Sequence, residues 1–109
     1  MTKAVYINLL VNDLYASRQF FEALGYGFND TFSNEEVANL VISDTIKAML
    51  HTEQSLKQYT KRPLANPKDT TEVLIALQQD TKVGVDELME KALAAGGKEF
   101  RPTEDHGFM

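Results

Sequence analysis

The sequence predicts an α+β fold built around a strand–helix unit that occurs twice. The first copy is an apolar strand at residues 4–11, followed by a helix that begins near Asp13 and ends at Gly25. The second copy is a strand at residues 72–79, followed by a helix that ends at Gly96. A repeat of this length is a whole supersecondary unit, so it constrains the fold before any short motif is considered.

The first strand has two different faces. Because side chains alternate along a strand, residues 4–11 place one set on each side of a sheet. The apolar set is expected to lie under the helices, and it consists of Val5, Ile7, Leu9 and Val11. The other set is expected to point to the concave side of the sheet, and it consists of Tyr6, Asn8 and Leu10.

The helix that follows has recognisable ends. Asn12 or Asp13 can cap it, because a short side-chain oxygen accepts a hydrogen bond from a free amide of the first turn. Gly25 suits the left-handed residue that ends many helices. Three short strands are expected next, the first two as a hairpin, at residues 26–32, 37–43 and 46–52. The first module, about residues 3–52, therefore has the order strand, helix, three strands.

The second half of the chain is expected to repeat only part of this order. Residues 53–71 form a connector that begins with a short helix at 53–59 and ends in a loop. A helix is then predicted by apolar residues at helical spacing, namely Val85, Leu88, Met89, Ala92 and Ala95. A short strand is expected at residues 98–101, before the sequence stops at Met109. The second module, residues 72–109, is therefore expected to be incomplete.

A ferredoxin-like α+β sandwich uses similar elements and remains an alternative. The strand–helix–three-strand order of the first module favours the repeat instead. Aligning the two copies pairs Ile7 with Ile75 and Leu9 with Leu77, so both keep an apolar face under the helices. We therefore expect one domain over residues 1–109.

Composition and charge restrict the function classes. The 109 residues carry a formal net charge of −5, and phosphate binding needs a clustered basic face, so no nucleic-acid partner is expected. There are no cysteines, which excludes disulfides, thiolate metal sites and cysteine nucleophiles. No apolar run approaches membrane-spanning length and no secretory leader is recognised, so we expect a cytoplasmic protein without a membrane partner.

The first copy resembles the opening of a known superfamily. The residues that carry the resemblance are Asn12-Asp13-Leu14, Ser17, Phe20-Phe21 and Leu24-Gly25-Tyr26. The second copy, residues 94–97 and the ending at 104–109 extend it along the chain. In order and spacing, these pieces are similar to the vicinal oxygen chelate superfamily, which includes glyoxalase I, bleomycin-resistance proteins and extradiol dioxygenases.

The resemblance implies two βαβββ modules whose sheets curl around a shared cavity, here with the second module incomplete. Members of the superfamily continue with further strands, so we expect that the present chain is truncated. A homodimer formed by exchange of strands or modules would complete the cavity. The expected partner in that cavity is a small organic molecule.

The metal positions of the superfamily fall on residues that are poor ligands. Metal-dependent members hold a divalent ion through His, Glu or Gln side chains on cavity-facing strands. Carried over by the resemblance, these positions fall on Tyr6, Leu50 and Leu74; a neutral phenol is a poor ligand and leucine is none. We therefore expect no cofactor, and a ligand bound by Tyr6, Asn8, Leu50 and Leu74. A purely structural role for Tyr6 and Asn8 stays open, and no catalytic residue is identified.

The alternative function is a divalent-metal-dependent lyase or isomerase of the glyoxalase type. It would need His51, Glu104 or His106 to supply replacement ligands for Ni, Zn, Mn or Fe. His51 follows the Leu50 position, so strand alternation predicts that it points outward, as a surface or interface histidine. For His106, a terminal loop residue without a catalytic role is the simpler interpretation.

Overall fold

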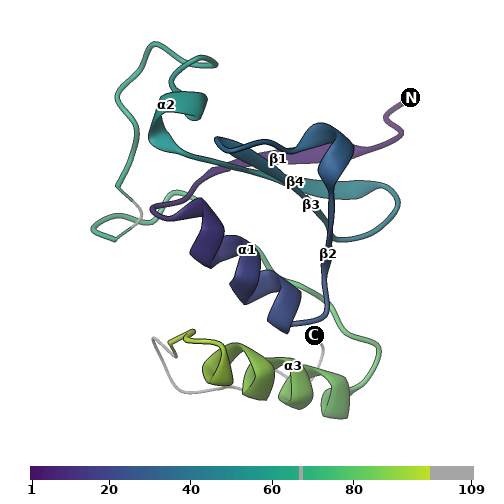
Figure 1. Ribbon diagram of the computed structural model, residues 1–109. Coiled ribbons are helices and arrows are strands. Elements are labelled where there is room, and N and C mark those ends of the chain that lie inside the picture. Colours follow the sequence, from purple (N-terminus) through teal and green to yellow (C-terminus); the bar gives the residue numbers. More distant parts are fainter. Residues whose placement is uncertain (67, 99–109) are drawn as a thin grey trace.

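One four-stranded mixed sheet organises the chain in the computed structural model, which describes residues 1–66 and 68–98 (Figure 1). Its strands are β1 (Val5–Leu10), β2 (Gly27–Asn29), β3 (Val37–Val41) and β4 (Ile46–His51). The strand order is β1-β4-β3-β2, with β1 parallel to β4 and the other pairings antiparallel. The α+β class and the strand–helix–three-strand order of the first module are confirmed.

Helix α1 (Leu14–Ala23) connects β1 to β2 and covers one face of the sheet (Figure 1). At its start, the Asp13 carboxylate accepts a hydrogen bond from the Ala16 backbone N at 3.0 Å. At its end, Gly25 has a φ of 98°, a left-handed conformation that would strain any other residue. The sequence had indicated both of these residues as the ends of the helix.

The hydrophobic core lies between α1 and the sheet. Its buried members are Leu40, Ala48 and Leu50. The partly buried side chains packed against them are Leu9, Val11, Leu14, Phe21, Tyr26, Phe28 and Ile42. Because burial of apolar surface is the dominant favourable term in folding, this cluster holds the sheet and α1 together.

Two short segments lie on the other side of the sheet from α1 (Figure 1). Helix α2 (Glu53–Leu56) follows β4 and contacts β1 and β4. The 3-10 helix η1 (Asp30–Phe32) follows β2 and contacts β3. The helix expected at residues 53–59 is therefore present but shorter than predicted.

The second half of the chain forms no second sheet within the described residues. The prediction of a strand at residues 72–79 is wrong, because this segment is irregular and pairs with no strand of the sheet. Strand β1 is held by β4, and the described part of the chain contains no second copy of β4. The backbone groups of residues 72–79 therefore have no ladder to join, and Val73, Leu74 and Ile75 are exposed.

Helix α3 (Lys82–Ala94) confirms the second predicted helix, which is followed by Gly96 at a φ of 102°. It lies against α1, on the side away from the sheet (Figure 1). Its exposed apolar side chains are Val83, Val85, Met89 and Leu93. Lys98 belongs to no strand, and the remainder of the predicted strand at 98–101 lies outside the described residues.

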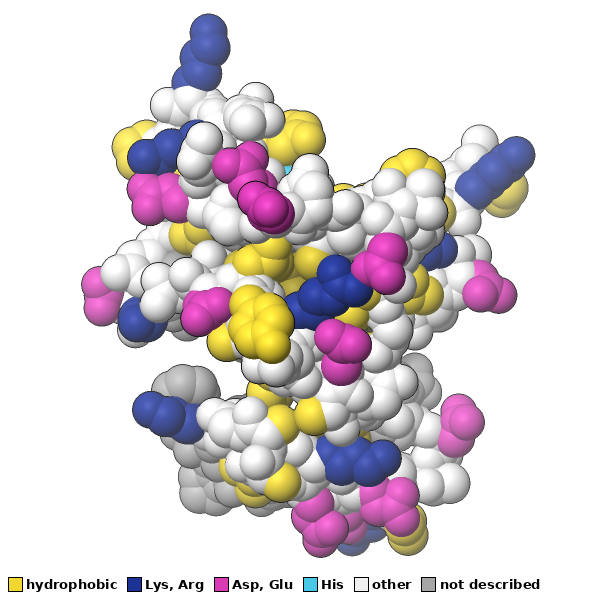
Figure 2. Space-filling model, in the orientation of Figure 1, with side chains coloured by type: hydrophobic (Ala, Val, Ile, Leu, Met, Phe, Trp, Pro, Cys, Tyr) yellow, Lys and Arg dark blue, Asp and Glu magenta, His cyan; other side chains and the backbone are white. Residues whose placement is uncertain are grey.

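The surface gives no sign of a basic patch on the face shown in Figure 2, where acidic and basic side chains are intermixed. Among the helices in the described ranges, none combines the length and the apolar character needed to span a membrane.

Candidate functional site

The face of the sheet opposite α1, here called the open face, carries polar side chains in a regular grid. Strand pairing aligns one residue from each strand in a central row, namely Asn8, Met49, Asn39 and Asn29. The row on one side contains Leu10, His51 and Val37. The row on the other side contains Tyr6, Lys47, Val41 and Gly27.

Three hydrogen-bonded side chains on this face, here called the His51 cluster, are Asn8, His51 and Ser55. The His51 Nε2 atom lies 2.8 Å from Asn8 Oδ1, and its Nδ1 atom lies 2.8 Å from Ser55 Oγ. His51 is only 2% exposed and Ser55 only 5%, whereas Asn8 is exposed to solvent. The cluster therefore connects a buried serine, through a buried histidine, to an asparagine at the surface.

The chain after β4 folds back to cover His51. Thr52 caps α2, because its Oγ1 accepts from the Ser55 backbone N at 3.3 Å, and this places Ser55 beside the ring. Tyr59 then contacts His51 edge-to-face, with ring centroids 5.4 Å apart and planes at 60°. Only a trace of histidine surface is visible in Figure 2, in keeping with this cover.

Burial favours the neutral form of His51. Removing the ring from water disfavours its charged form and lowers the pKa of His51 below its ordinary value. The neutral ring satisfies both contacts when Nε2–H donates to Asn8 Oδ1 and the Ser55 hydroxyl donates to Nδ1. The cluster therefore fixes the orientation of the Asn8 amide, with its oxygen turned toward the histidine.

The structure places Tyr6 and Asn8 on the open face, both of them exposed to solvent. Tyr6 is 57% exposed, so it does not fill the core. Asn8 bonds a buried side chain rather than a backbone group. Their position is the one expected for ligand contacts, and a role in binding stays a prediction.

Leu50 and His51 exchange the places that the sequence interpretation gave them. Leu50 is paired with Leu9 and Ala38, faces α1, and is 1% exposed in the core. His51 shares the open face with Asn8 and is buried, so the expectation of an outward-pointing surface histidine is wrong. Because side chains alternate along a strand, an error of one residue in the carried-over register exchanges the two faces.

The other predicted site residues are not brought to the open face. Leu74 lies in the irregular segment before α3 and is 87% exposed. Glu104 and His106 lie outside the described residues. The described part of the site is therefore built from β1, β4 and the segment after β4.

The described residues of the open face do not form a metal site. Within residues 1–66 and 68–98, no group of three His, Cys, Asp or Glu side chains could hold one. On the open face, His51 is the one histidine in the three rows, and both of its ring nitrogens already have partners. A metal would have to displace Asn8 or Ser55 from the ring.

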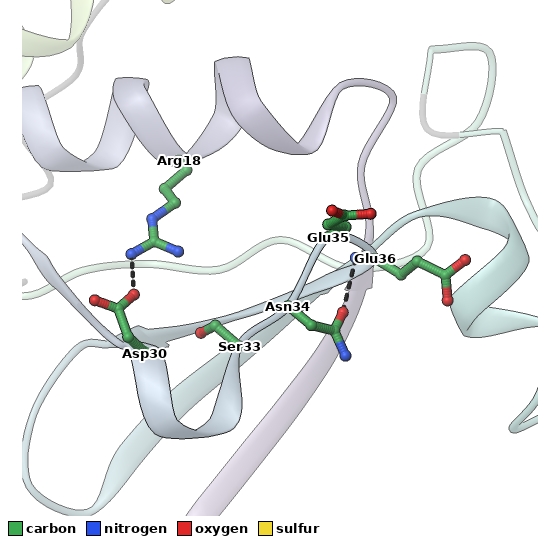
Figure 3. Close-up of a pocket in the computed structure, with 6 residues that line it drawn as sticks. All are labelled: Arg18, Asp30, Ser33, Asn34, Glu35 and Glu36. Carbon is green, nitrogen blue, oxygen red and sulfur yellow. Dashed lines mark hydrogen bonds and ion pairs between the residues drawn. The ribbon is translucent and has the colours of Figure 1, made fainter.

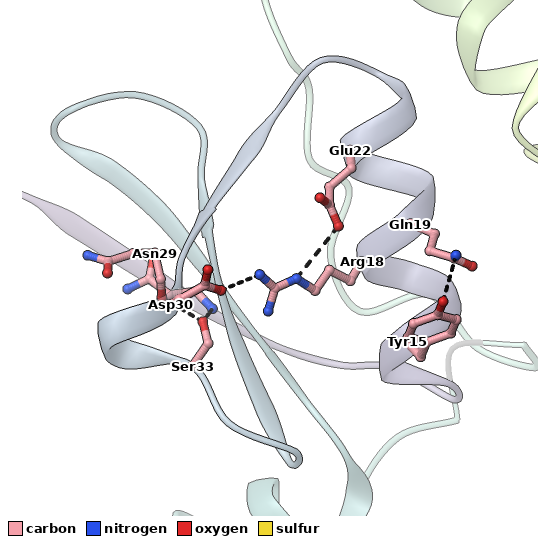
Figure 4. A network of polar contacts seen from close by, with 8 residues as sticks. Tyr15, Arg18, Gln19, Glu22, Asn29, Asp30 and Ser33 are labelled. Carbon is pink, nitrogen blue, oxygen red and sulfur yellow. Dashed lines mark hydrogen bonds and ion pairs between the residues drawn. The ribbon is translucent and has the colours of Figure 1, made fainter.

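A second polar group lies at the edge of the sheet, between α1 and η1. Arg18 forms ion pairs with Asp30 and with Glu22, the latter at 3.6 Å (Figure 4), and its guanidinium lies 4.8 Å from the Phe28 ring centroid. The hydrogen bond that Arg18 donates to the Asp30 carboxylate raises the pKa of Arg18. An open hollow of about 640 Å³ adjoins it, lined by Arg18, Asp30, Ser33, Asn34, Glu35 and Glu36 (Figure 3). Because Arg18 is already engaged on three sides, this group fastens α1 to η1.

Comparison with known proteins agrees with this architecture. Residues 3–43 match the family model described as bleomycin resistance protein-like N-terminal. A hypothetical protein from S. aureus is 28% identical with a TM-score of 0.78, covering 98% of this chain and 80% of that one. A glyoxalase/bleomycin resistance protein/dioxygenase family enzyme from Burkholderia phytofirmans is 21% identical with a TM-score of 0.65, covering 84% and 71%. A search of the curated proteins gave no match.

The fold is therefore that of the glyoxalase/bleomycin-resistance proteins. The match over residues 3–43 and the likeness to these structures support the resemblance to the vicinal oxygen chelate superfamily that the residues of the first strand and helix had indicated.

Sequence reasoning placed His51 on the wrong face of the sheet and did not single out Asn39. The position of His51 on the open face was indicated by the apolar alternation of Ile46, Ala48 and Leu50. This alternation assigns Leu50 to the core and the next residue, His51, to the opposite face. Asn39 carried no comparable signal, since its place beside Met49 depends on the pairing of β3 with β4.

Proposed function

We propose that this protein binds a small organic molecule on the open face, without a metal ion. The observation that carries the proposal is the His51 cluster, in which a buried histidine has partners at both ring nitrogens and one of these partners is an exposed asparagine. Buried polar clusters of this kind hold a side chain in one orientation. An oriented amide beside an exposed phenol is a suitable contact surface for a ligand.

In this proposal His51 is a positioning residue and Asn8 is the residue that contacts the ligand. Because the amide is planar and its Oδ1 accepts from His51, the Asn8 Nδ2 group is left to donate to a ligand. Tyr6 lies two residues earlier on the same face and offers its ring for stacking. Tyr59 contacts the His51 ring edge-to-face.

We further propose that a second copy of the chain completes the cavity. Support comes from the exposed apolar side chains of the irregular segment, Val73, Leu74 and Ile75, and from β1, which lies at an edge of the sheet. Exposed apolar groups and an edge strand each favour association. Sedimentation at several concentrations tests this, and a monomer throughout would contradict it.

A screen of small organic molecules against the full chain tests the binding proposal. Hits from a thermal-shift assay would be mapped by NMR, and we expect them to shift resonances of Tyr6, Asn8 and His51. Asn8→Ala should weaken the hits, whereas Asn12→Ala, at an exposed asparagine near the start of α1, should not. Hits that map elsewhere, or equal effects of the two variants, would contradict it.

Metal analysis tests the second part of the proposal. After incubation with Ni, Zn, Mn or Fe and removal of excess metal, we expect less than one equivalent to remain bound. One tightly bound metal per chain would instead support the lyase alternative. That alternative also requires activity that is lost in both His51→Ala and His106→Ala.

A further inference from the structure

Asn39 has a buried oxygen that nothing in the described part of the chain satisfies. The residue is 3% exposed, and its Oδ1 has no hydrogen-bond partner there. An unpaired buried acceptor costs about 1–3 kcal/mol, and each such group in a native protein calls for an explanation. Its neighbour Asn29 differs, because Asn29 Oδ1 accepts from the Thr31 backbone N at 3.0 Å.

The position of Asn39 in the grid indicates what its partner would be. Asn39 and Asn8 lie on either side of Met49 in the central row. Adjacent strands are about 4.8 Å apart, so the β1 and β3 backbones are about 9.6 Å apart at this row. That span accommodates one aromatic ring or one planar amide lying over the soft, polarisable side chain of Met49.

The two asparagines offer complementary groups to a molecule between them. Asn8 presents its Nδ2 donor, because His51 occupies its oxygen. Asn39 holds an Oδ1 acceptor that has no partner in the described residues and is buried, so a ligand must displace what covers this atom to reach it. A ligand that fits both must therefore carry an acceptor at one end and a donor at the other.

Charge selects among such ligands. No acidic residue occupies any position of the three rows of the open face. The Lys47 ammonium group, in the row beside the central one, donates to the backbone carbonyl of Asp44. A cation on this face would meet no opposite charge in the three rows, and an anion would have to draw the Lys47 ammonium away from the Asp44 carbonyl, whereas a neutral amide loses less hydration.

We propose that the open face takes an uncharged, planar ligand in which a carboxamide or similar group is attached to an aromatic ring. Its N–H group donates to Asn39 Oδ1, and its oxygen accepts from Asn8 Nδ2. This inference rests on the proposed function and specifies the ligand class for the same site. Met49 lies beneath the ring, and Tyr6 flanks it.

Three probes of nearly equal shape test the charge of the ligand. They are benzamide, benzoate and benzamidine, which are neutral, anionic and cationic at pH 7.5. Each would be titrated into the ¹⁵N-labelled full chain at the same ionic strength. Benzamide should shift the side-chain amides of Asn8 and Asn39 and bind about tenfold more tightly than either ion, the value of one good hydrogen bond. Equal or tighter binding of an ion, or no shift in the central row, would overturn the inference.

Asn39→Leu tests the role of the unpaired oxygen. The variant removes Oδ1 without breaking any hydrogen bond at that atom, so we expect it to fold and to bind benzamide about tenfold more weakly. Asn12→Ala is the control and should bind as the unsubstituted protein does. Unchanged affinity in folded Asn39→Leu would overturn the inference. If the variant does not fold, the inference is tested in the unsubstituted protein by the ranking of the three probes and by the shift of the Asn39 side-chain amide.

The failure of this inference is distinguishable from failure of the proposed function. If a broad library yields compounds that map to the open face but all are charged, the ligand class is wrong and the binding function stands. If no compound of any charge maps to that face, both fail.

Discussion

The first strand–helix unit and its copy in the second half of the chain have similar sequences and different structures. In the first, β1 joins a sheet, and Leu14 and Phe21 of α1 pack on a core whose central residues are almost fully buried. In the second, residues 72–79 join no strand, and α3 leaves Val83 and Val85 exposed. The two units thus share a sequence pattern, but only the first packs its apolar residues into a core.

The difference shows what turns an apolar segment into a strand. The backbone of β1 is satisfied by β4, which lies beside it in parallel. The described residues contain no equivalent partner for 72–79, although Ile75 and Leu77 repeat Ile7 and Leu9. Strand propensity depends on context, and the neighbouring strand is the largest part of that context. A helix needs no such partner for its backbone, which is why α3 forms and its preceding segment does not.

The largest expected difference between the two regions is in the protection of backbone amides against hydrogen exchange. Amides of β4, paired on both sides, are expected to exchange only through global unfolding, and those of α3 through local opening. A difference of about 3 kcal/mol in opening free energy corresponds to about a hundredfold in protection. Exchange measured by NMR at pH 7 gives both values. Equal protection in α3 and β4 would show that the two regions unfold as one unit.

A matched pair of leucine truncations should give the next largest effect. Leu50→Ala opens a cavity at a position that is 1% exposed, and we expect a loss of about 2–5 kcal/mol in the free energy of unfolding. Leu93→Ala, at a position in α3 that is 43% exposed, should cost well under that. Urea titrations followed by far-UV circular dichroism measure both. Similar losses in the two variants would contradict the proposed division.

The pattern of successes and errors in the sequence interpretation follows the same division. Asp13 and Gly25 were predictable because a helix end is decided by a few neighbouring residues. The contact between Asn8 and His51 joins residues far apart in sequence, and it depends on the register of β1 against β4. The predicted register of this strand was wrong by one residue, which exchanged the faces assigned to Leu50 and His51. The prediction of a strand at residues 72–79 failed because the local pattern says nothing about whether a partner strand is present.

Lowering the pH should weaken the first region through His51. Its pKa is lowered in the folded protein by burial, so the unfolded chain binds the proton more readily. The stabilisation by neutral His51 is therefore fully present above its unfolded pKa of about 6.5 and is lost as the pH falls toward the folded value. Urea titrations between pH 7.5 and 5.5 measure this. In His51→Gln that part of the pH dependence should vanish, and a dependence identical to that of the unsubstituted protein would assign it to other groups.

The helix caps offer the finest test, because α1 and α3 are capped in the same way. The Asp13 side chain accepts from Ala16 N at 3.0 Å, and the Thr81 hydroxyl accepts from Gly84 N at 2.9 Å. Asp13→Ala should lower the free energy of global unfolding by about 1 kcal/mol, since α1 covers the core. Thr81→Ala should leave global unfolding almost unchanged and instead speed hydrogen exchange within α3, because that helix opens locally. If both substitutions lower the free energy of unfolding in urea by the same amount, α3 is coupled to the sheet through its contact with α1. The two regions then form one cooperative unit despite their different packing.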